Sequence, residues 1–457
     1  MSTSQGPTPV LNSTLPFWRT TPDELDKHRS TPELPEECDI LIIGAGFSGA
    51  SLAYHIYKDN PFPPSVLILE AREACSGATG RNGGHLKPDT FYSIPKHSER
   101  YGPEAAVQLA RFEASHLAAI KNLVQKEQID CDFVLTRTCD AIMDPDMAKE
   151  AEKWFHDLIQ DGTADLDDVH FTSGKYAERI SGVKGAAACF TYTAGHLWPY
   201  KLVIHLLKSA LQRGANLQTM TPVFEVSDNP LPDGRWLVKT ERGDVKAQKV
   251  IFATNAYTSR LAPQFRNKII PVKGNCSRIV VPEGKSSPYL PFTYCIRYTH
   301  TLYDYLIPRP DGSIVAGGGR YSFWRNIPQW YNVADDSQLI ESGKDYFNGL
   351  MQRTFIGWED SGAYTEKVWS GIMGESSDLM PFVGHVPDKE GQAVLAGFSG
   401  HGMPVIFLAA RGLVQMLLDG KSFEETGLPP MYEVTKERMD SERNEILDDL
   451  PAPSASL

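Results

Sequence analysis

The sequence lacks the features that mark several large classes of protein. Its seven cysteines are scattered, odd in number and never spaced as C-x-x-C. This pattern argues against a disulfide framework and a zinc site, and it predicts reduced thiols. The net charge is -12, and no basic stripe is present, so the chain would repel the phosphates of a nucleic acid. We predict no metal site and no nucleic-acid partner.

Targeting and membrane signals are also missing. The start, MSTSQGPTPV, has neither the basic nor the apolar region of a secretory signal. The end, SASL, differs from the S-K-L peroxisomal address. The longest apolar helix pattern, at 403–418, is short for a membrane span and contains Arg411. We therefore expect a cytoplasmic protein that does not enter a membrane.

The length of 457 residues is too great for one ordinary core and predicts two domains or one large composite domain. Residues 1–36 are rich in Pro, Ser and Thr, and we interpret them as an N-terminal extended arm held by Phe17 and Trp18. Residues 421–457 are polar and acidic, and we expect a C-terminal tail that is surface-bound or loose.

A glycine motif follows the arm. The continuous apolar run at 39–43 is typical of a buried parallel strand, and GAGFSG comes directly after it. A helical pattern at 48–58 and a second apolar strand at 65–70 complete a βαβ unit. This is the context in which G-x-G-x-x-G binds a dinucleotide.

Each glycine of the motif has a physical role. Gly44 should make the tight turn, Gly46 should let backbone N–H groups approach a pyrophosphate, and Gly49 should let helix and strand pack closely. Phe47 and Ser48 open the helix, whose N-terminus favours negative charge. We predict that all five residues bind the cofactor.

The second strand ends in an acidic residue, Glu70, about twenty residues after the motif. Its carboxylate should accept hydrogen bonds from a ribose 2′-hydroxyl, which disfavours NADP. A second glycine-rich loop, EAREACSGATGRNGGHLKP at 70–88, follows at once. A nicotinamide-binding domain has no need of such a loop, so the cofactor predicted is FAD and not NAD.

At this loop the chain resembles the FAD-dependent D-amino acid oxidase superfamily, which includes glycine oxidase and sarcosine oxidase. SGATGRNGGH is most similar to the gamma-glutamylputrescine oxidase-like amine oxidases, and the resemblance covers about residues 37–420. It implies that this loop passes the pyrophosphate and reaches the flavin ring. The implied cofactor contacts are Glu70, Ala71, Arg72, Ser76, Gly77, Thr79, Arg81, Asn82, Gly83, Gly84 and His85.

Two later segments fit the same family. TPVFEV would present the backbone of Val223 to the adenine, and VIFATNAYT, with Thr254, would be a buried strand near the FAD. GFSGHGMP resembles the closing motif of the family, in which a helix is aimed at the flavin. Such a helix N-terminus would stabilise the negative charge that arrives with a hydride. The residues implied there are Gly400, His401, Gly402 and Met403.

The fold class predicted is α/β, as an α+β composite. A Rossmann-like FAD-binding domain would be discontinuous, at 37–95, 191–261 and 366–420. A mainly antiparallel β-sheet substrate domain would be inserted at 96–190 and 262–365.

The resemblance implies oxidation of a C–N bond. A hydride leaves the carbon beside an amine for flavin N5, the imine hydrolyses to a carbonyl, and in oxidases oxygen becomes hydrogen peroxide. The expected partners are a small-molecule amine and molecular oxygen.

The chain departs from the family in three places. The segment that carries a carboxylate-binding Arg in members acting on small amino acids has Met373 here, which favours an amine or a larger amino compound held otherwise. The same segment contains no Cys for flavin attachment, and His85 is out of register with the His used by some relatives, so we expect non-covalent FAD. The strand expected to carry an oxygen-activating Lys has none, although Lys273 is an alternative.

The catalytic candidates are His85, His401, Asp304 and Tyr305. The two histidines are the best-placed ionisable groups near the flavin, and we expect Asp304 and Tyr305 to face the pocket. Arg297, Arg309 or Arg320 would have to supply any carboxylate clamp, and Arg309 is expected to be structural. For Lys273 and Glu375 we favour a solvated or structural role and an exposed position, respectively.

Aromatic residues at 293–306 and 321–331 suit a cationic or bulky amine or form ordinary core. Three alternatives stay open: an FAD-dependent dehydrogenase or biosynthetic oxidase on a larger amino compound, an NAD(P)H-dependent monooxygenase, and a non-catalytic flavoprotein that acts as an assembly or binding partner.

Overall fold

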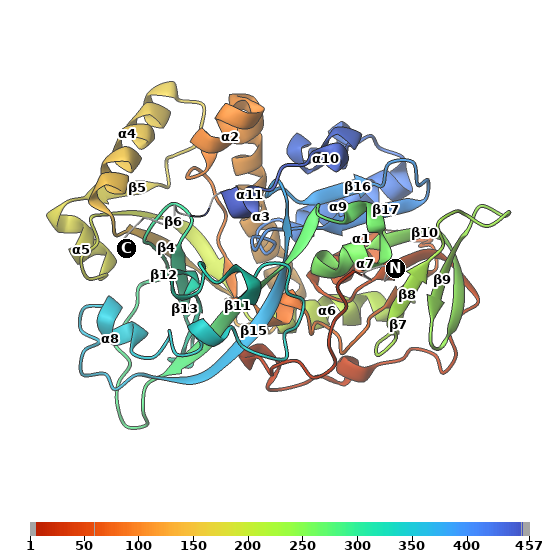
Figure 1. The fold of residues 1–457 in the computed structure, drawn as a ribbon, viewed down its shortest axis with the longest axis horizontal. Helices are drawn as coiled ribbons and strands as arrows, with labels where there is room; N and C mark the ends of the chain where they lie inside the picture. Colours follow the sequence, from red (N-terminus) through yellow and green to blue (C-terminus); the bar gives the residue numbers. More distant parts are fainter. Residues whose placement is uncertain (1–5, 59, 449, 451–457) are drawn as a thin grey trace.

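The computed structural model describes residues 6–58, 60–448 and 450. Two β-sheets occupy opposite ends of the molecule, and the long helix α3 (Pro103–Glu127) lies between them (Figure 1). The two ends therefore correspond to a nucleotide-binding sheet and a second sheet, as the sequence predicts.

The first sheet contains the βαβ unit. Its central strands are parallel in the order β17-β10-β1-β2-β7, and β16 and the β8–β9 hairpin add antiparallel strands. Its strands are β1 (Glu37–Ile43), β2 (Val66–Leu69), β7 (Asn216–Gln218), β8 (Val223–Val226), β9 (Trp236–Thr240), β10 (Gly243–Phe252), β16 (Phe382–His385) and β17 (Gln392–Ala396).

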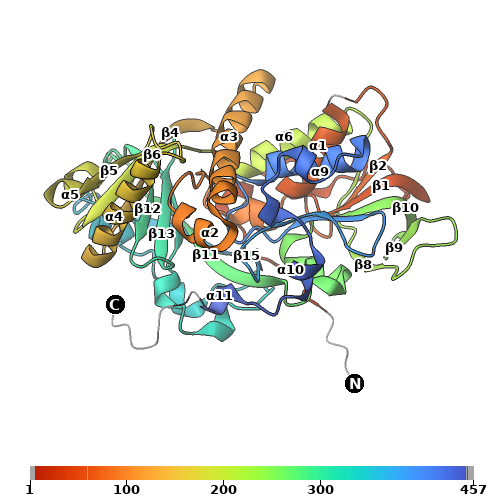
Figure 2. The same ribbon diagram turned by 90° about the horizontal axis from the view of Figure 1, so that it is seen from above.

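Both faces of this sheet are buried. Helices α1 (Phe47–Lys58), α6 (Pro199–Leu211) and α9 (Ile406–Asp419) cover one face (Figure 2). In β1, Ile40 and Ile42 pack against these helices, whereas Leu41 and Ile43 pack into a second cluster with β9. The continuous apolar run in the sequence follows from this two-sided burial.

The second sheet is mainly antiparallel, in the order β15-β11-β14-β13-β12-β4-β6-β3, with β5 beside β6 and one parallel pair, β12 with β4. Its strands are β3 (His85–Leu86), β4 (Val134–Ile142), β5 (His170–Ser173), β6 (Ala188–His196), β11 (Ile269–Val280), β12 (Phe292–Arg297), β13 (Tyr303–Pro308), β14 (Ile314–Gly318) and β15 (Tyr364–Ser376). The predicted α/β class with a second, mainly antiparallel sheet is confirmed.

Helices also cover both faces of the second sheet. Residues of α3 and α4 (Pro145–Asp161) pack on one face, and residues of α5 (Lys175–Ser181) and α8 (Leu350–Thr354) pack on the other. The remaining helices are α2 (Ile94–Tyr101), α7 (Thr258–Leu261), α10 (Lys436–Asp440) and α11 (Glu445–Asp448). No helix in the described ranges is long and apolar enough to cross a bilayer.

The strand pairing differs in places from the expected domain segments. β15 pairs with β11, and β6 pairs with β4, so both strands belong to the second sheet. Most of their residues were assigned to the FAD-binding segments 366–420 and 191–261. The strands cross between the two halves of the molecule, and a sequence pattern does not show on which sheet a strand finds its partner.

The N-terminal arm is pinned as expected. The Trp18 side chain is fully buried, and its indole N–H donates to the carbonyl of Asn82 at 2.6 Å. Phe17 is buried beside it. The arm therefore packs directly on the second glycine-rich loop.

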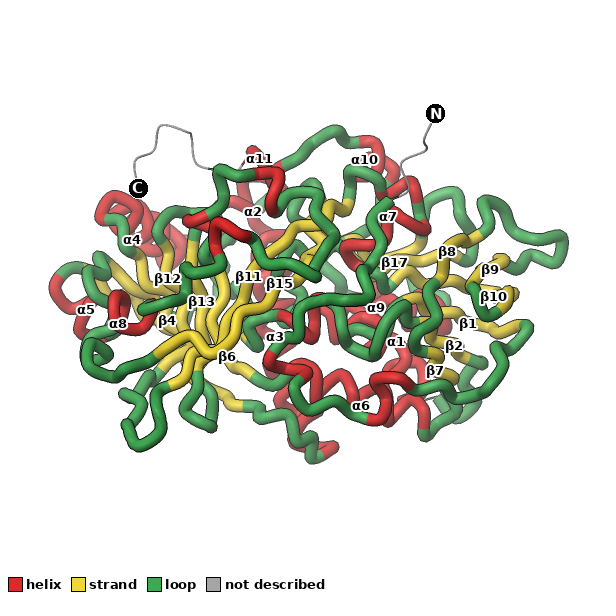
Figure 3. The backbone as a smooth tube through the Cα atoms, turned by 60° about the horizontal axis from the view of Figure 1, so that its bottom comes forward, coloured by secondary structure: helices red, strands yellow, loops and turns green. Residues whose placement is uncertain are grey.

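Of the two states expected for the tail, surface-bound or loose, the described residues 421–448 have the first. Tyr432 and Ile446 are buried, and Glu445 forms an ion pair with Arg100 of α2 at 2.6 Å. Figure 3 shows the tail passing from α10 to α11 along the side of the molecule where α2, β11 and β15 lie. Although the segment is mostly polar, a few buried apolar residues, among them Tyr432 and Ile446, hold it against the rest of the protein.

The closing glycine segment is also displaced from expectation. Gly400 to Met403 were expected to begin a helix, but α9 begins at Ile406, and these residues form the turn before it. Gly400 has φ +74°, a left-handed conformation that suits glycine and not the start of a helix.

All seven cysteine thiols are buried, and none forms a disulfide.

Candidate active site

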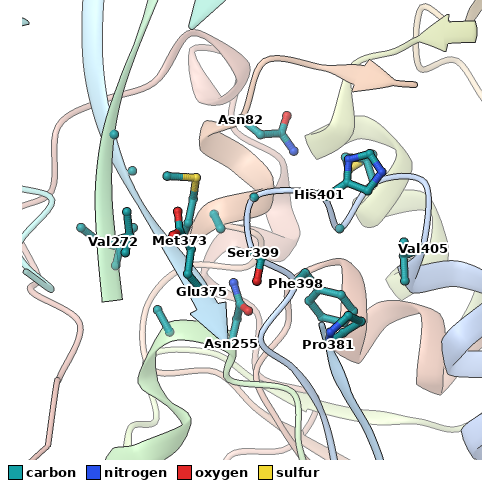
Figure 4. Close-up of a pocket in the computed structure, with 18 of the residues that line it drawn as sticks. Asn82, Asn255, Val272, Met373, Glu375, Pro381, Phe398, Ser399, His401 and Val405 are labelled. Atoms are coloured by element: carbon teal, nitrogen blue, oxygen red, sulfur yellow. The ribbon is translucent and has the colours of Figure 1, made fainter. Parts of the chain in front are cut away.

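One cavity of about 1310 Å³ joins the two sheets. Its wall includes Ile43, Leu69 and Ala253, at the carboxyl ends of β1, β2 and β10, together with residues of β11, β13 and β15. Figure 4 shows part of this space, with Met373 and Glu375 on one side and Ser399 and His401 on the other. Ligands of open parallel sheets bind at this edge.

Most cofactor candidates from the sequence lie in the cavity wall. They are Gly44, Gly46, Phe47, Ser48, Glu70, Ala71, Arg72, Gly77, Thr79, Arg81, Asn82, Gly83, His85, Val223, Thr254, Gly400, His401, Gly402 and Met403. Gly49, Ser76 and Gly84 are not part of the wall. Ser76 is fully buried, and a Cβ on Gly84 would lie 2.8 Å from the Ile307 side chain, so protein atoms surround both.

The glycines of the first motif have the conformations expected of them. Gly44 has φ +110°, and a Cβ on Gly49 would lie 1.9 Å from the carbonyl oxygen of Gly44. Gly46 differs, because a Cβ there would have only the Thr79 hydroxyl within 4 Å, at 3.5 Å. The protein itself therefore does not require glycine at 46, and the space beside its backbone opens on the cavity.

This space fits the dinucleotide that the motif predicts. A pyrophosphate can approach the backbone at Gly46 and the N-terminus of α1. The cavity also exceeds the usual volume of a drug-sized ligand site, about 300–1,000 Å³, so it has room for FAD and a substrate. Residues from the motif, the second glycine-rich loop and Val223 would hold the FAD.

Glu70 lines the cavity, and its carboxylate also accepts hydrogen bonds from the backbone. Its two carboxylate oxygens accept hydrogen bonds from the N–H groups of Ala45 at 2.8 Å and Arg72 at 2.9 Å. The carboxylate therefore fixes the glycine turn, and its remaining lone pairs are available for the predicted ribose contact.

A buried ion cluster anchors the second glycine-rich loop. The Asp336 carboxylate pairs with Arg72 at 3.0 Å and with Arg81 at 3.3 Å, and all three side chains are at most 3% exposed. Arg81 also donates to the carbonyls of Ser76 and Ser370. The two arginines were predicted as cofactor contacts, but their guanidinium groups are bound to protein, so their main role in the structure is to position the loop.

His85 and Tyr305 lie together in the wall. Their rings meet edge to face with centroids 5.5 Å apart, and the Tyr305 hydroxyl contacts the Cys276 thiol at 3.5 Å. Burial lowers the pKa of His85 to about 3, so its imidazole is neutral at pH 7. The Nε2 atom of His85 is buried without a hydrogen-bond partner in the described structure.

His401 is held by an acidic residue that the sequence did not reveal. Its Nε2 lies 2.7 Å from the carboxylate of Glu113 in α3, and the same oxygen accepts the backbone N–H of Asp89. The His401 side chain is 45% exposed, and the partial loss of hydration would lower its pKa, but the Glu113 carboxylate raises it. Glu113 is 4% exposed, so the pair forms a fixed proton-binding group at the cavity.

Asp304 does not line the cavity, contrary to expectation. Its carboxylate accepts hydrogen bonds from the hydroxyls of Tyr298 and Tyr346, at 3.0 and 2.6 Å, and from the N–H of Gly319. Successive residues of a strand point to opposite faces. Because Tyr303 and Tyr305 face the cavity, Asp304 between them faces away.

The three arginines considered as carboxylate clamps differ in their ion-pair partners and in whether they line the cavity. Arg297 lines the cavity, but its guanidinium pairs with buried Asp140 at 3.0 Å, whereas Arg309 pairs with Asp132 and does not line the cavity. Arg320 lines the cavity. Arg309 is thus structural, as predicted, and Arg320 is the candidate still available to a ligand.

Glu375, expected to be exposed, and Lys273, expected to be solvated or structural, both lie in the cavity wall. Glu375 and Lys273 are each 6% exposed, and both line the cavity. Burial raises the pKa of Glu375 and lowers the pKa of Lys273. Met373 also lines the cavity, 3.2 Å from where a Cβ of Gly400 would be, so the place of the expected arginine does face the ligand space.

Sequence reasoning missed several other parts of the site. Asn255, with φ +44°, bonds the N–H of Gly397 and lines the cavity. The arm at 7–11 and the tail at 445–450 also contribute wall residues. Asp336 and Glu113 act on partners hundreds of residues away in the chain, and no local pattern marks them.

A cleft at the carboxyl edge of a parallel sheet, with a dinucleotide turn and a second glycine-rich loop, defines a flavin-dependent oxidoreductase. The chain belongs to the FAD dependent oxidoreductase (DAO) family, whose profile matches residues 39–416. The predicted family, enzyme class and FAD cofactor are therefore confirmed.

Relatives of known identity share most of the chain. It is 25% identical over 406 residues to gamma-glutamylputrescine oxidoreductase of Escherichia coli (strain K12), with 86% of this chain and 87% of that protein covered. It is 22% identical to glycine oxidase of Bacillus subtilis (strain 168), with 85% and 95% covered. The crystal structure of glycine oxidase from Geobacillus kaustophilus has the same fold, with a TM-score of 0.69, 20% identity, and 88% and 99% coverage.

Replacing the carboxylate of the ion cluster should weaken the fold. We expect Asp336→Asn to lower the free energy of unfolding by about 3–5 kcal/mol, because two buried guanidinium groups lose their counter-charge. FAD should also be retained less well. Urea unfolding and the bound flavin per chain are the measurements. The matched control is Asp335→Asn, next in the chain but not part of the cluster; equal losses in both variants would contradict this role.

Removing the partner of His401 should change its titration. We expect Glu113→Gln to lower the pKa of His401, because the carboxylate that stabilises the imidazolium is gone. A histidine ring NMR titration measures this, with Glu104→Gln, an exposed position on the same helix, as control.

The same pair sets the direction of a stability change with pH. Because folding raises the pKa of His401, its stabilising contribution is complete below the unfolded-state value of about 6.5. It is lost as the pH rises through the folded-state value. Native protein and Glu113→Gln should therefore differ more just below pH 6.5 than above the folded-state pKa of His401. A difference that grows at high pH would contradict the assignment.

Proposed function

We propose that this protein oxidises the C–N bond of an amine or of an amino compound larger than glycine. The carrying observation is Met373, which occupies the cavity wall where related enzymes acting on small amino acids have a carboxylate-binding arginine. A thioether cannot bind a carboxylate as a guanidinium does. FAD, when bound, supplies the acceptor that takes a hydride at its N5 atom. The products are then an imine, its carbonyl hydrolysis product and, with oxygen as acceptor, hydrogen peroxide.

The walls of the cavity support an amine substrate. Tyr92, Trp154, Tyr303, Tyr305 and Phe323 line it. Aromatic faces attract cations and pack against bulky apolar groups. An amine in this space is partly removed from water, which favours the neutral form needed for hydride loss over an ammonium of pKa about 10.

Ionisable residues of the cavity wall would exchange protons with the substrate. His401, oriented by Glu113 through a 2.7 Å contact, is the group that we propose exchanges a proton with the substrate. Tyr305 also lines the cavity, beside the neutral ring of His85. Asp304 is not included, because its carboxylate is bonded away from the cavity.

Further expectations remain part of this proposal. FAD is held without a covalent bond, and the protein works in a reducing compartment such as the cytoplasm. Seven buried, unpaired thiols support the second point.

Anaerobic reduction of the purified holoenzyme tests the substrate class. We expect diamines, polyamines, N-methyl amines or longer amino acids to bleach the visible flavin band, and glycine and D-alanine to leave it unchanged. Bleaching by glycine or D-alanine would contradict the argument from Met373. A flavin that no compound of the panel reduces would favour a non-catalytic flavoprotein, and reduction by NAD(P)H would favour a monooxygenase.

Lys273 provides a separate test of the oxidase assignment. A buried cation at the cavity would stabilise negative charge that develops on oxygen. We expect Lys273→Met to slow reoxidation of the reduced enzyme by oxygen about 10²-fold, with a smaller effect on anaerobic reduction by the amine. Stopped-flow absorbance measures both steps, with exposed Lys246→Met as control. Equal reoxidation rates would remove Lys273 from this role.

A further inference from the structure

Two opposite charges in the cavity wall have no ion-pair or hydrogen-bond partner among the described residues. The Glu375 carboxylate is 6% exposed, and the described residues provide it with neither a hydrogen bond nor an ion pair. The Nε atom of Arg320 is buried without an acceptor, and its guanidinium stacks on the Trp330 ring, 4.4 Å from the centroid. A buried charge without a partner is costly, so proteins rarely keep one without a use.

The fold fixes both groups at one part of the cavity. Glu375 lies on β15, opposite Ile270 of β11 in the strand register. It points to the same side of its strand as Met373, as Figure 4 shows. Arg320 begins the short turn after β14, behind Gly319 with φ +64°. The strand pairing and the Trp330 contact therefore hold each charge in place.

The surroundings of these charges are apolar. Ile270, Val272, Phe323 and Trp330 form one buried cluster with Ile446 of the tail. Burial raises the pKa of Glu375, and Arg320 is the one charged group that opposes this. The two side chains thus act on each other electrostatically, yet no pair of their charged atoms lies within 4 Å.

The arrangement selects the charge pattern of a ligand. A simple cation would be attracted by Glu375 but repelled by Arg320. A simple anion would be attracted by Arg320 but repelled by Glu375. A group that carries both charges satisfies both side chains at once. We propose that Glu375 and Arg320 form a subsite for a zwitterionic amino-acid group, with its ammonium on Glu375 and its carboxylate on Arg320.

This subsite deepens the proposed function and rests on it, because it defines which larger amino compound the cavity accepts. It also explains how a carboxylate can be bound although Met373 replaces the arginine of related enzymes. The guanidinium is supplied from the short turn after β14, and the acidic residue comes from the strand that carries the methionine.

Three probes of equal chain length separate the two charges. Norleucine carries both, 1-aminopentane lacks the carboxylate, and hexanoate lacks the amine. Their binding to the dithionite-reduced holoenzyme is measured by anaerobic calorimetry, because a flavin that is already reduced cannot accept a hydride from norleucine. We expect norleucine, in at least one enantiomer, to bind about tenfold or more tightly than either single-charge probe, the usual effect of a hydrogen-bonded charge.

Two variants assign each charge to its residue. Glu375→Gln should weaken norleucine about 10- to 100-fold and abolish its advantage over hexanoate. Arg320→Met should abolish its advantage over 1-aminopentane. Exposed Glu390→Gln and Arg266→Met are matched controls and should bind as the native protein does. Bound flavin and circular dichroism verify that each variant is folded.

The outcomes separate this inference from the proposed function. Native-like norleucine binding in either variant, equal binding of the three probes, or no binding of norleucine overturns the subsite even if an amine reduces the flavin. Conversely, the expected binding pattern upholds the subsite even if no compound bleaches the flavin, because calorimetry records binding without turnover.

Discussion

The pairing of one buried carboxylate with two arginines holds this site together. Asp336 binds Arg72, near the start of the second glycine-rich loop, and Arg81, in the middle of the loop. The backbone of Asp336 also binds Thr14 of the N-terminal arm. One residue thus joins the loop, the arm and the segment before β15. An ion pair so deeply buried stabilises little by itself, but its loss leaves charges that cannot reach water.

The charged residues around the cavity fall into two groups. Glu113 with His401 and Asp140 with Lys87 and Arg297 are paired within the protein and fix the shape of the wall. Glu375 and Arg320 are not paired in this way. The paired residues fix the positions of the side chains in the wall. Glu375 and Arg320 are left with charges that a bound ligand can neutralise. This division separates the residues that build the site from those that recognise what enters it.

The sequence predicted the nucleotide half of the molecule well, because its signals are local. The turn at Gly44 and the close contact at Gly49 depend on residues within one βαβ unit. The other half depends on side-chain direction and distant pairing. Asp304 was expected in the pocket beside Tyr305, although neighbours in a strand face opposite ways. Glu375 was expected at the surface, but the structure buries it beside β11 and the tail. No local sequence pattern shows that these distant segments pack there.

The wall of the cavity draws on residues from almost the whole length of the described chain. Pro7 and Leu11 lie in it, and so do Glu445, Ile446 and Leu450. During synthesis the first group leaves the ribosome long before the second. The nucleotide turn can therefore form early, but the cavity around it cannot be complete until residue 450 has emerged. Enclosure of the cofactor is thus a late event in folding, because it needs residues from both ends of the described chain.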